Sequence, residues 1–186
     1  MRIPVALLGL ALAGLALAPP AGADDPEPEI ADLDVRLDGG QVVVAFELQN
    51  AFSPKLLERV DSGLPTSFEF EIQMLRERRW WFDRKTRRKL EVTATYDAVT
   101  MEYQVSYRLK GELVDSRVVQ GHADLEKAMT KIEKLPVFEI DSPEDIEDAR
   151  VRVRADFGWK ALLWLIPVPE NSDWAVSRDL ETEPPS

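Results

Sequence analysis

Hydrophobic and polar residues alternate along most of this chain, which is the period of a β-strand that buries one face. In the clearest stretch, polar residues separate Phe68, Phe70, Ile72 and Met74. The alternation resumes at Leu90 after a segment rich in arginine and aromatic residues. The pattern therefore predicts a long β-hairpin whose base, 68–74 and 90–96, forms the spine of the core.

The register of this hairpin follows if the apolar faces of its two strands are kept together. That register places Met74 opposite Ala94 and Trp80 opposite Arg88, around a three-residue tip at Asp83–Lys85. A tryptophan that faces an arginine across two strands favours a cation–π contact of roughly 0.5–1 kcal/mol at an exposed site.

The same alternation predicts further strands on both sides of the long hairpin. Asp38-Gly39-Gly40 joins the first two strands, because glycine adopts the positive φ angles of tight turns, and Lys110-Gly111-Glu112 joins a later pair. A short extended piece is expected at Val137–Ile140 and a final short strand at Trp174–Val176. The remaining strands are expected over 31–37, 41–49, 103–109, 113–120 and 149–157.

Two segments carry the signals of short helices. Ser53 and Pro54 begin the first as N-cap and first helical residue, and Gly63 ends it. In the second, over 124–135, apolar residues recur every three or four positions, and Pro136 closes it. The apolar positions of this second helix are Leu125, Ala128, Met129, Ile132 and Leu135.

The late apolar segment 159–166 is compatible with a buried helix or a covering strand, and burial is favoured. If the segment were exposed, its tryptophans and leucines would form an apolar patch of the kind that marks an interaction site. The side chains concerned are Trp159, Leu162, Leu163 and Trp164. The proline-framed segment 167–174 is expected to form a turn that carries Trp174.

These elements together predict a mainly β fold. Seven or eight strands, mostly in hairpin order, favour an antiparallel β-sandwich, immunoglobulin-like or similar, with one or two short inserted helices. We expect one domain over 31–178, followed by a flexible polar tail at 179–186.

The N-terminus has the pattern of a secretory signal peptide over 1–23. Arg2 is its charged start, 3–18 its apolar part and Ala21-Gly22-Ala23 its cleavage site. Because the apolar run is shorter than the roughly 20 residues of a spanning helix, we expect cleavage before Asp24 rather than a membrane anchor. The acidic, proline-rich segment 24–30 is expected to be a disordered leader.

The chain has no cysteine and one histidine, His122. This composition excludes disulfides, thiol nucleophiles and zinc–thiolate sites. Since no nucleophile motif accompanies His122, we assign no catalytic residue, metal ligand or cofactor, and an enzyme is not favoured. Two alternatives stay open: a carboxylate-based hydrolase, and a calcium-dependent carbohydrate-binding domain that uses the carboxylates of 141–148.

Charge is distributed unevenly along the chain. The formal net charge is −11, whereas the segment Arg76–Lys89 holds eight basic and two acidic residues, a net of +6. A globally acidic protein does not attract nucleic-acid phosphates, so nucleic-acid binding is not expected. A concentrated basic segment on an acidic body instead predicts a molecule with one positive end.

That basic segment is the candidate partner-binding surface. Arginine, tryptophan and phenylalanine are favoured at interfaces, and basic residues with aromatics suit an anionic membrane surface. A purely structural interpretation also stays open, in which the aromatics cap the core and the arginines pair with the acidic body. The candidate residues are Arg76, Arg78, Arg79, Trp80, Trp81, Phe82, Arg84, Lys85, Arg87 and Arg88.

Three pieces of sequence together resemble a known bacterial family. They are Gly63-Leu64-Pro65-Thr66-Ser67-Phe68-Glu69-Phe70, the tract Arg78–Asp83, and Ile166-Pro167-Val168-Pro169-Glu170-Asn171-Ser172-Asp173-Trp174. In this order they resemble the exported domain of unknown function 4390, over about 30–177. The family has no assigned activity, so the resemblance transfers no catalytic residue. It implies a bacterial source and a periplasmic or cell-envelope location.

We therefore expect a secreted, non-enzymatic binding or accessory module of the cell envelope. Its expected partner is an envelope protein or an anionic membrane surface. The sequence leaves its oligomeric state open.

Overall fold

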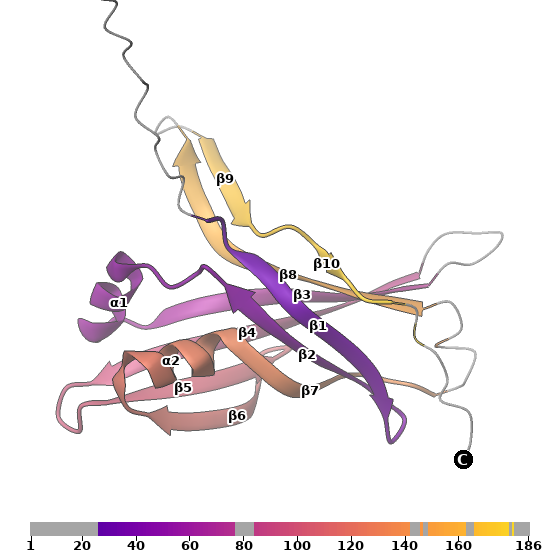
Figure 1. Cartoon of the computed structure of the whole chain (residues 1–186), viewed down its shortest axis with the longest axis horizontal. Coiled ribbons are helices and arrows are strands. Elements are labelled where there is room, and N and C mark those ends of the chain that lie inside the picture. Colours follow the sequence, from indigo (N-terminus) through magenta and orange to yellow (C-terminus); the bar gives the residue numbers. More distant parts are fainter. Residues whose placement is uncertain are drawn as a thin grey trace, which may run out of the picture.

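The computed structural model describes residues 26–76, 84–141, 146, 149–162, 166–178 and 180, with 84–85, 158–162 and 166–170 described by their backbone alone. This part of the chain contains ten strands and two helices (Figure 1). No helix within it is long and apolar enough to cross a membrane. The elements are β1 Glu29–Asp38, β2 Gln41–Gln49, α1 Pro54–Asp61, β3 Thr66–Arg76, β4 Arg84–Asp97, β5 Glu102–Leu109, β6 Glu112–Val119, α2 Gly121–Thr130, β7 Lys131–Glu139, β8 Ala149–Leu162, β9 Ile166–Asn171 and β10 Ala175–Val176.

The strands form two antiparallel sheets. The smaller sheet has the order β1-β2-β7, and the larger has the order β10-β8-β3-β4-β5-β6, with β9 pairing to β8. Figure 1 shows the small sheet lying across one face of the large sheet. The predicted antiparallel β-sandwich is therefore confirmed, with ten strands in the described part rather than seven or eight.

The core lies between β2 and β7 on one side and β3, β4, β5 and β8 on the other. The rings of Phe46 from β2 and Phe70 from β3 meet edge to face across it, 5.1 Å apart. All four apolar residues of the predicted β3 pattern are buried. Alternation was informative here because only one face of the large sheet meets the small one.

The hairpin of β3 and β4 exists, but the predicted register is wrong. Met74 pairs with Thr86 and Ala94 pairs with Thr66, which shifts the two strands by eight residues relative to the prediction. Arg88 consequently lies opposite Ile72 rather than opposite Trp80, and Arg84 and Lys85 belong to a strand rather than to a tip. An even shift keeps every side chain on its predicted face, so the apolar pattern could not distinguish the two registers.

Helix α1 begins and ends as predicted. The Ser53 side chain accepts a hydrogen bond from the Leu56 N–H (3.3 Å), and Pro54 is the first helical residue. Gly63 follows the helix with φ +81°, a conformation that glycine adopts without a steric penalty. Val60 carries the apolar face of α1 into the core.

The second helix is shorter than predicted. Helix α2 ends at Thr130, and Ile132 and Leu135 lie instead in β7, where they pair with Phe46 and Val44. The spacing of Ile132 and Leu135 fits a helical period. The segment nevertheless forms a strand, because β7 forms backbone hydrogen bonds with the edge of β2. Pro136 did not close a helix: it lies in β7, an edge strand, where a missing N–H is tolerated.

The C-terminal elements also differ from expectation. Residues 159–162 continue β8, in agreement with the strand alternative, and the burial of 159–166 lies outside the described side chains. Ile166–Asn171 is strand β9 rather than a turn, because it pairs with the extended end of β8. Its prolines occupy a strand that has one partner in the described part of the chain.

The ends of the domain extend slightly beyond the predicted limits. Strand β1 begins at Glu29, which pairs with Gln49, so the last two residues of the predicted leader are ordered. The Leu180 N–H donates to the Ala149 carbonyl (2.9 Å), and the Leu180 side chain packs against the core. The predicted signal peptide and the remaining tail residues lie outside the described chain.

Candidate functional site

The three predicted candidates whose side chains are described, Arg76, Arg87 and Arg88, do not share one surface, because alternation places successive residues of a strand on opposite faces. Arg88 points into the sandwich, with its guanidinium 5.3 Å from the Phe138 ring centre. Arg87 lies on the outer face and is exposed. Arg76 shares the inward parity of Met74. The predicted candidates 78–82 lie outside the described residues, and Arg84 and Lys85 are placed by their backbone alone.

The outer face of the large sheet instead gathers cations from two strands on either side of β3. Gln73 has Arg87 of β4 on one side and Arg152 of β8 on the other. Glu71, two residues along, has Lys89 and Arg154 as its neighbours. Arg150 lies beside Leu75, one step nearer the end of the hairpin. We call Arg87, Lys89, Arg150, Arg152 and Arg154 the basic face.

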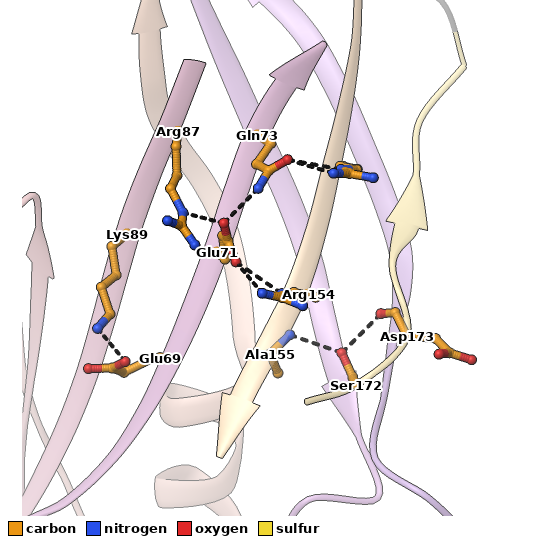
Figure 2. Close-up of polar contacts among 10 residues, drawn as sticks. Glu69, Glu71, Gln73, Arg87, Lys89, Arg154, Ala155, Ser172 and Asp173 are labelled. Atoms are coloured by element: carbon orange, nitrogen blue, oxygen red, sulfur yellow. Dashed lines mark hydrogen bonds and ion pairs between the residues drawn. The ribbon is translucent and has the colours of Figure 1, made fainter. Parts of the chain in front are cut away.

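Glu71 is the acid at the centre of the basic face. Its Oε2 accepts two hydrogen bonds from Arg154, 3.0 Å from Nε and 2.7 Å from Nη2. Its Oε1 accepts one from Gln73 Nε2 (2.6 Å) and forms an ion pair with Arg87 (Figure 2). The residue is only 7% exposed. Both carboxylate oxygens are therefore held from three directions.

This environment fixes the charge of Glu71. Burial raises the pKa of its carboxyl, but hydrogen bonds from Arg87, Gln73 and Arg154 outweigh burial and lower the pKa from 4.5 to about 2. Glu71 is the one buried carboxylate among the described residues. A carboxylate that stays ionised in this way positions arginines well and cannot serve as a general acid near neutral pH.

The outer face changes sign along the strands. Beyond the Glu71 level, Glu69 is flanked by Glu91 of β4 and Asp156 of β8. Lys89 marks the boundary, because it forms an ion pair with Glu69 (Figure 2). A shallow hollow of about 400 Å³ lies over this boundary, lined by side chains that include Lys110 and Asp156. The face is therefore basic toward the hairpin end and acidic toward the other.

Trp174 covers part of the basic face. Its ring lies 4.0 Å from the guanidinium carbon of Arg152 and 4.6 Å from that of Arg154. Arg152 also donates to Gln73 Oε1, 3.1 Å from Nε and 2.8 Å from Nη2. The two arginines are thus held between the tryptophan and the polar side chains of β3.

Two serines position Trp174 against β8. The Ser172 N–H donates to the Ala155 carbonyl (2.9 Å), and the Ser172 Oγ accepts the Ala155 N–H (2.9 Å; Figure 2). Ser177 repeats this arrangement with Val151, at 2.8 and 3.0 Å. In each case the serine hydroxyl accepts a β8 backbone N–H, as the carbonyl of a neighbouring strand would. The residues before and after β10 are therefore hydrogen-bonded to the sheet.

A second polar cluster lies where α1 and α2 approach β5. The Tyr103 hydroxyl donates to Asp61 Oδ1 (2.6 Å), and His122 Nε2 lies 3.0 Å from Asp61 Oδ2. Burial, with the hydrogen bond to Asp61, raises the pKa of Tyr103 to about 12. No serine or other nucleophile joins these contacts in the described residues. The arrangement links the two helices to the sheet.

No group of three or more histidine or carboxylate side chains in the described part of the chain could hold a metal ion. Most of the acidic segment 141–148 lies outside that part. The calcium-dependent alternative therefore rests on the sequence of 141–148 alone.

Sequence reasoning missed four residues of the basic face: Lys89, next to the predicted candidates, and the three β8 arginines Arg150, Arg152 and Arg154. The alternation of these arginines with buried Val151 and Val153 predicted an exposed strand face. The missing information was that β8 pairs with β3, which brings this face beside Arg87 and Lys89. No spacing in the sequence encodes that neighbourhood.

The family of the chain follows from comparison with known proteins. The family model described as domain of unknown function DUF4390 matches residues 25–181, which include every described helix and strand. No curated protein and no solved structure matches significantly. The match covers most of the chain and agrees with the resemblance found in its three sequence pieces. The chain belongs to the DUF4390 family.

Proposed function

We propose that this protein is an exported, non-enzymatic binding module of the cell envelope that docks on an anionic membrane surface through the basic face. The observation that carries the proposal is the gathering of five cations from β4 and β8 on one face, where Glu71 and Glu69 pair with three of them and leave a net charge of +3. Basic surfaces of this kind attract anionic leaflets, with ~1 kcal/mol contributed by each lysine or arginine near the surface.

The distribution of charge over the molecule supports docking with the hairpin end toward the membrane. The whole chain carries −11, and the outer face turns acidic beyond Glu71. An anionic surface would therefore attract the hairpin end and repel the opposite end. In the sequence, the segment 78–82 between β3 and β4 reads Arg-Arg-Trp-Trp-Phe, two cations and three aromatics, a composition suited to the interfacial region of a bilayer.

The chemistry of Glu71 supports binding over hydrolysis. A carboxylate-based hydrolase needs an acid that is protonated near neutral pH, opposite a second carboxylate. The pKa of Glu71 is shifted the other way, to about 2. Its neighbours across the strands are cations rather than a second carboxylate.

The test is a vesicle-binding assay with phosphatidylglycerol vesicles and, as a reference, phosphatidylcholine vesicles at low salt. The double variant Arg150→Gln with Arg152→Gln is expected to lower affinity for the anionic vesicles about tenfold or more, because each cation contributes ~1 kcal/mol. A second variant, Arg78→Ala with Arg79→Ala, measures the contribution of the segment outside the described chain.

The matched control is Lys55→Gln with Arg59→Gln on α1, which removes the same charge from the end of the sandwich away from the hairpin end (Figure 1). It is expected to bind like the wild type. Circular dichroism confirms that each variant is folded. Equal binding by all variants, or no preference for anionic vesicles, would overturn the membrane proposal and favour an acidic envelope protein as the partner.

A further inference from the structure

Strand β6 is an exposed edge of the large sheet. It ends the strand order after β5, and no described strand pairs with its other side. Seven of its eight residues are exposed. A groove of about 270 Å³ separates it from β7, the edge of the small sheet, so the small sheet leaves this edge open. An unpaired strand edge offers backbone donors and acceptors to another strand.

The edge also exposes apolar side chains. Leu113 is 56% exposed, Val114 50% and Val118 62%. These residues flank the centre of the strand, which is Asp115-Ser116-Arg117. In such a strand, the apolar side chains supply contact area for binding a partner strand, and the charged centre supplies specificity for it.

The charged centre is held in a defined arrangement. Arg117 Nε lies 3.0 Å from Asp115 Oδ2, and the Arg117 guanidinium packs on the Tyr107 ring at 5.0 Å. Asp115 Oδ1 accepts the N–H of Ser116 (2.8 Å). Asp115 and Arg117 pair with Tyr107 and Val105 of β5, whose side chains are buried, so both charges lie on the inner face of the sheet.

This charge order is complementary to itself. A two-fold axis perpendicular to the sheet keeps every side chain on its own face, so only residues of one face can be paired with each other. An axis at Asp115 or at Arg117 would place like charges opposite each other. An axis at Ser116 places Asp115 of each copy opposite Arg117 of the other, and brings Val118 beside the exposed Leu113–Val114 segment.

The same charges disfavour other strands. Inward-pointing charges and a bulge, here at the register shift between Tyr107 and Arg108, are features that protect a sheet edge from indiscriminate pairing. A partner strand without matching charges would leave Asp115 and Arg117 opposite apolar or like-charged side chains, which costs affinity. A second copy of this chain satisfies both charges at once.

We propose that two copies of this protein associate through β6 in antiparallel register about Ser116, joining their large sheets into one continuous sheet. Opposite charges directly across two strands stabilise the pairing, and like charges destabilise it. The two basic faces would then lie on the same side of the joined sheet. This proposal does not depend on the identity of the surface that the basic face binds.

The test is analytical ultracentrifugation of the purified protein and two charge variants at micromolar concentration. The wild type is expected to sediment as a dimer. Asp115→Arg alone and Arg117→Asp alone are each expected to sediment as monomers, since each places like charges across the axis. An equimolar mixture of the two variants is expected to regain dimers, because the two arginines of one variant would then face the two aspartates of the other.

A third variant keeps the charge pair. Val118→Lys adds a charge at an exposed position and is expected to weaken the dimer about tenfold, whereas Val99→Lys, in a turn where Val99 is 90% exposed, is not. A monomeric wild type would overturn the proposal. Dimers that persist in both single charge variants would also overturn it, because they would show that another surface associates.

Discussion

Glu71 is the residue on which the outer face of the sheet depends, and its pKa makes a prediction about acid stability. A group whose pKa is lowered on folding stabilises the protein above its unfolded pKa, and this stability is lost as the pH falls through the folded value. With a shift from 4.5 to about 2, the contribution at neutral pH is on the order of 3 kcal/mol. It should fall progressively between pH 5 and pH 2.

The measurement is urea denaturation of the wild type and of Glu71→Gln across this pH range. The difference in unfolding free energy between the two proteins is expected to be largest above pH 5 and to narrow toward pH 2. Glu69→Gln, which removes a more exposed ion pair with Lys89, is expected to cost ~0–1 kcal/mol. A difference between wild type and Glu71→Gln that stays constant with pH would contradict the assignment.

Ser172 carries a second prediction at the residue scale, because its hydroxyl oxygen is the acceptor for the backbone N–H of Ala155. Ser172→Ala leaves the Ala155 N–H, in a fully buried residue, without the acceptor it has at 2.9 Å. A buried donor without a partner costs about 1–3 kcal/mol. The unfolding free energy should fall by that amount.

The control for Ser172 is Ser62→Ala, whose exposed hydroxyl donates to the Arg59 carbonyl at the end of α1. This change should alter the unfolding free energy by no more than ~0.5 kcal/mol, as is usual for exposed positions. Equal losses at both serines would mean that Ser172 acts through something other than the buried N–H.

At the scale of elements, the register of the β3–β4 hairpin decides which residues share the basic face. Ser67 and Thr93 lie directly opposite each other, with their hydroxyl oxygens 2.7 Å apart. Opposite residues in an antiparallel pair have Cα atoms about 4.5–5.5 Å apart, which a disulfide can span. Ser67→Cys with Thr93→Cys should therefore cross-link readily on oxidation, and since the chain has no other cysteine, mobility on a non-reducing gel reports the bond directly.

The matched control tests the register that was predicted from the sequence. Leu75→Cys with Thr93→Cys would be opposite in that register, but in the structure the two positions are eight residues apart along the strand, or about 26 Å. It should not cross-link within one chain. Rapid cross-linking of this second pair would show that the hairpin adopts the shifted register.

Secondary-structure elements could be predicted where neighbouring residues alone determine their limits. The cap at Ser53 and the positive φ at Gly63 need only neighbouring residues, and α1 accordingly ends where expected. The segment 131–139 has no such local signal. Its apolar residues fit a helix and a strand equally, and β7 forms because β2 lies alongside to pair with it.

At the scale of the whole molecule, the charge distribution predicts a steep dependence of membrane binding on salt. The basic face and the acidic body act through charges near the surface, and the Debye length falls from about 10 Å at 0.1 M salt to about 3 Å at 1 M. Binding to anionic vesicles should therefore weaken strongly as salt is raised over that range. Binding that resists high salt would point to insertion of apolar side chains as the dominant attraction, and cosedimentation at several salt concentrations distinguishes the two.

The sequence by itself determined which face of β2, β3, β4, β5 and β8 is buried, where α1 lies and that the fold is an antiparallel sandwich. These follow from alternation, caps and turns, which act within a few residues. Only the tertiary structure decided the register of β3 and β4, the strand at 131–139 and the pairing of β8 with β3. Strand pairing joins segments far apart in the chain, such as Glu71 and Arg154, which are 83 residues apart, and any shift by an even number of residues preserves the same faces. The basic face is a product of that pairing, which is why its β8 arginines could not be recognised from the order of residues alone.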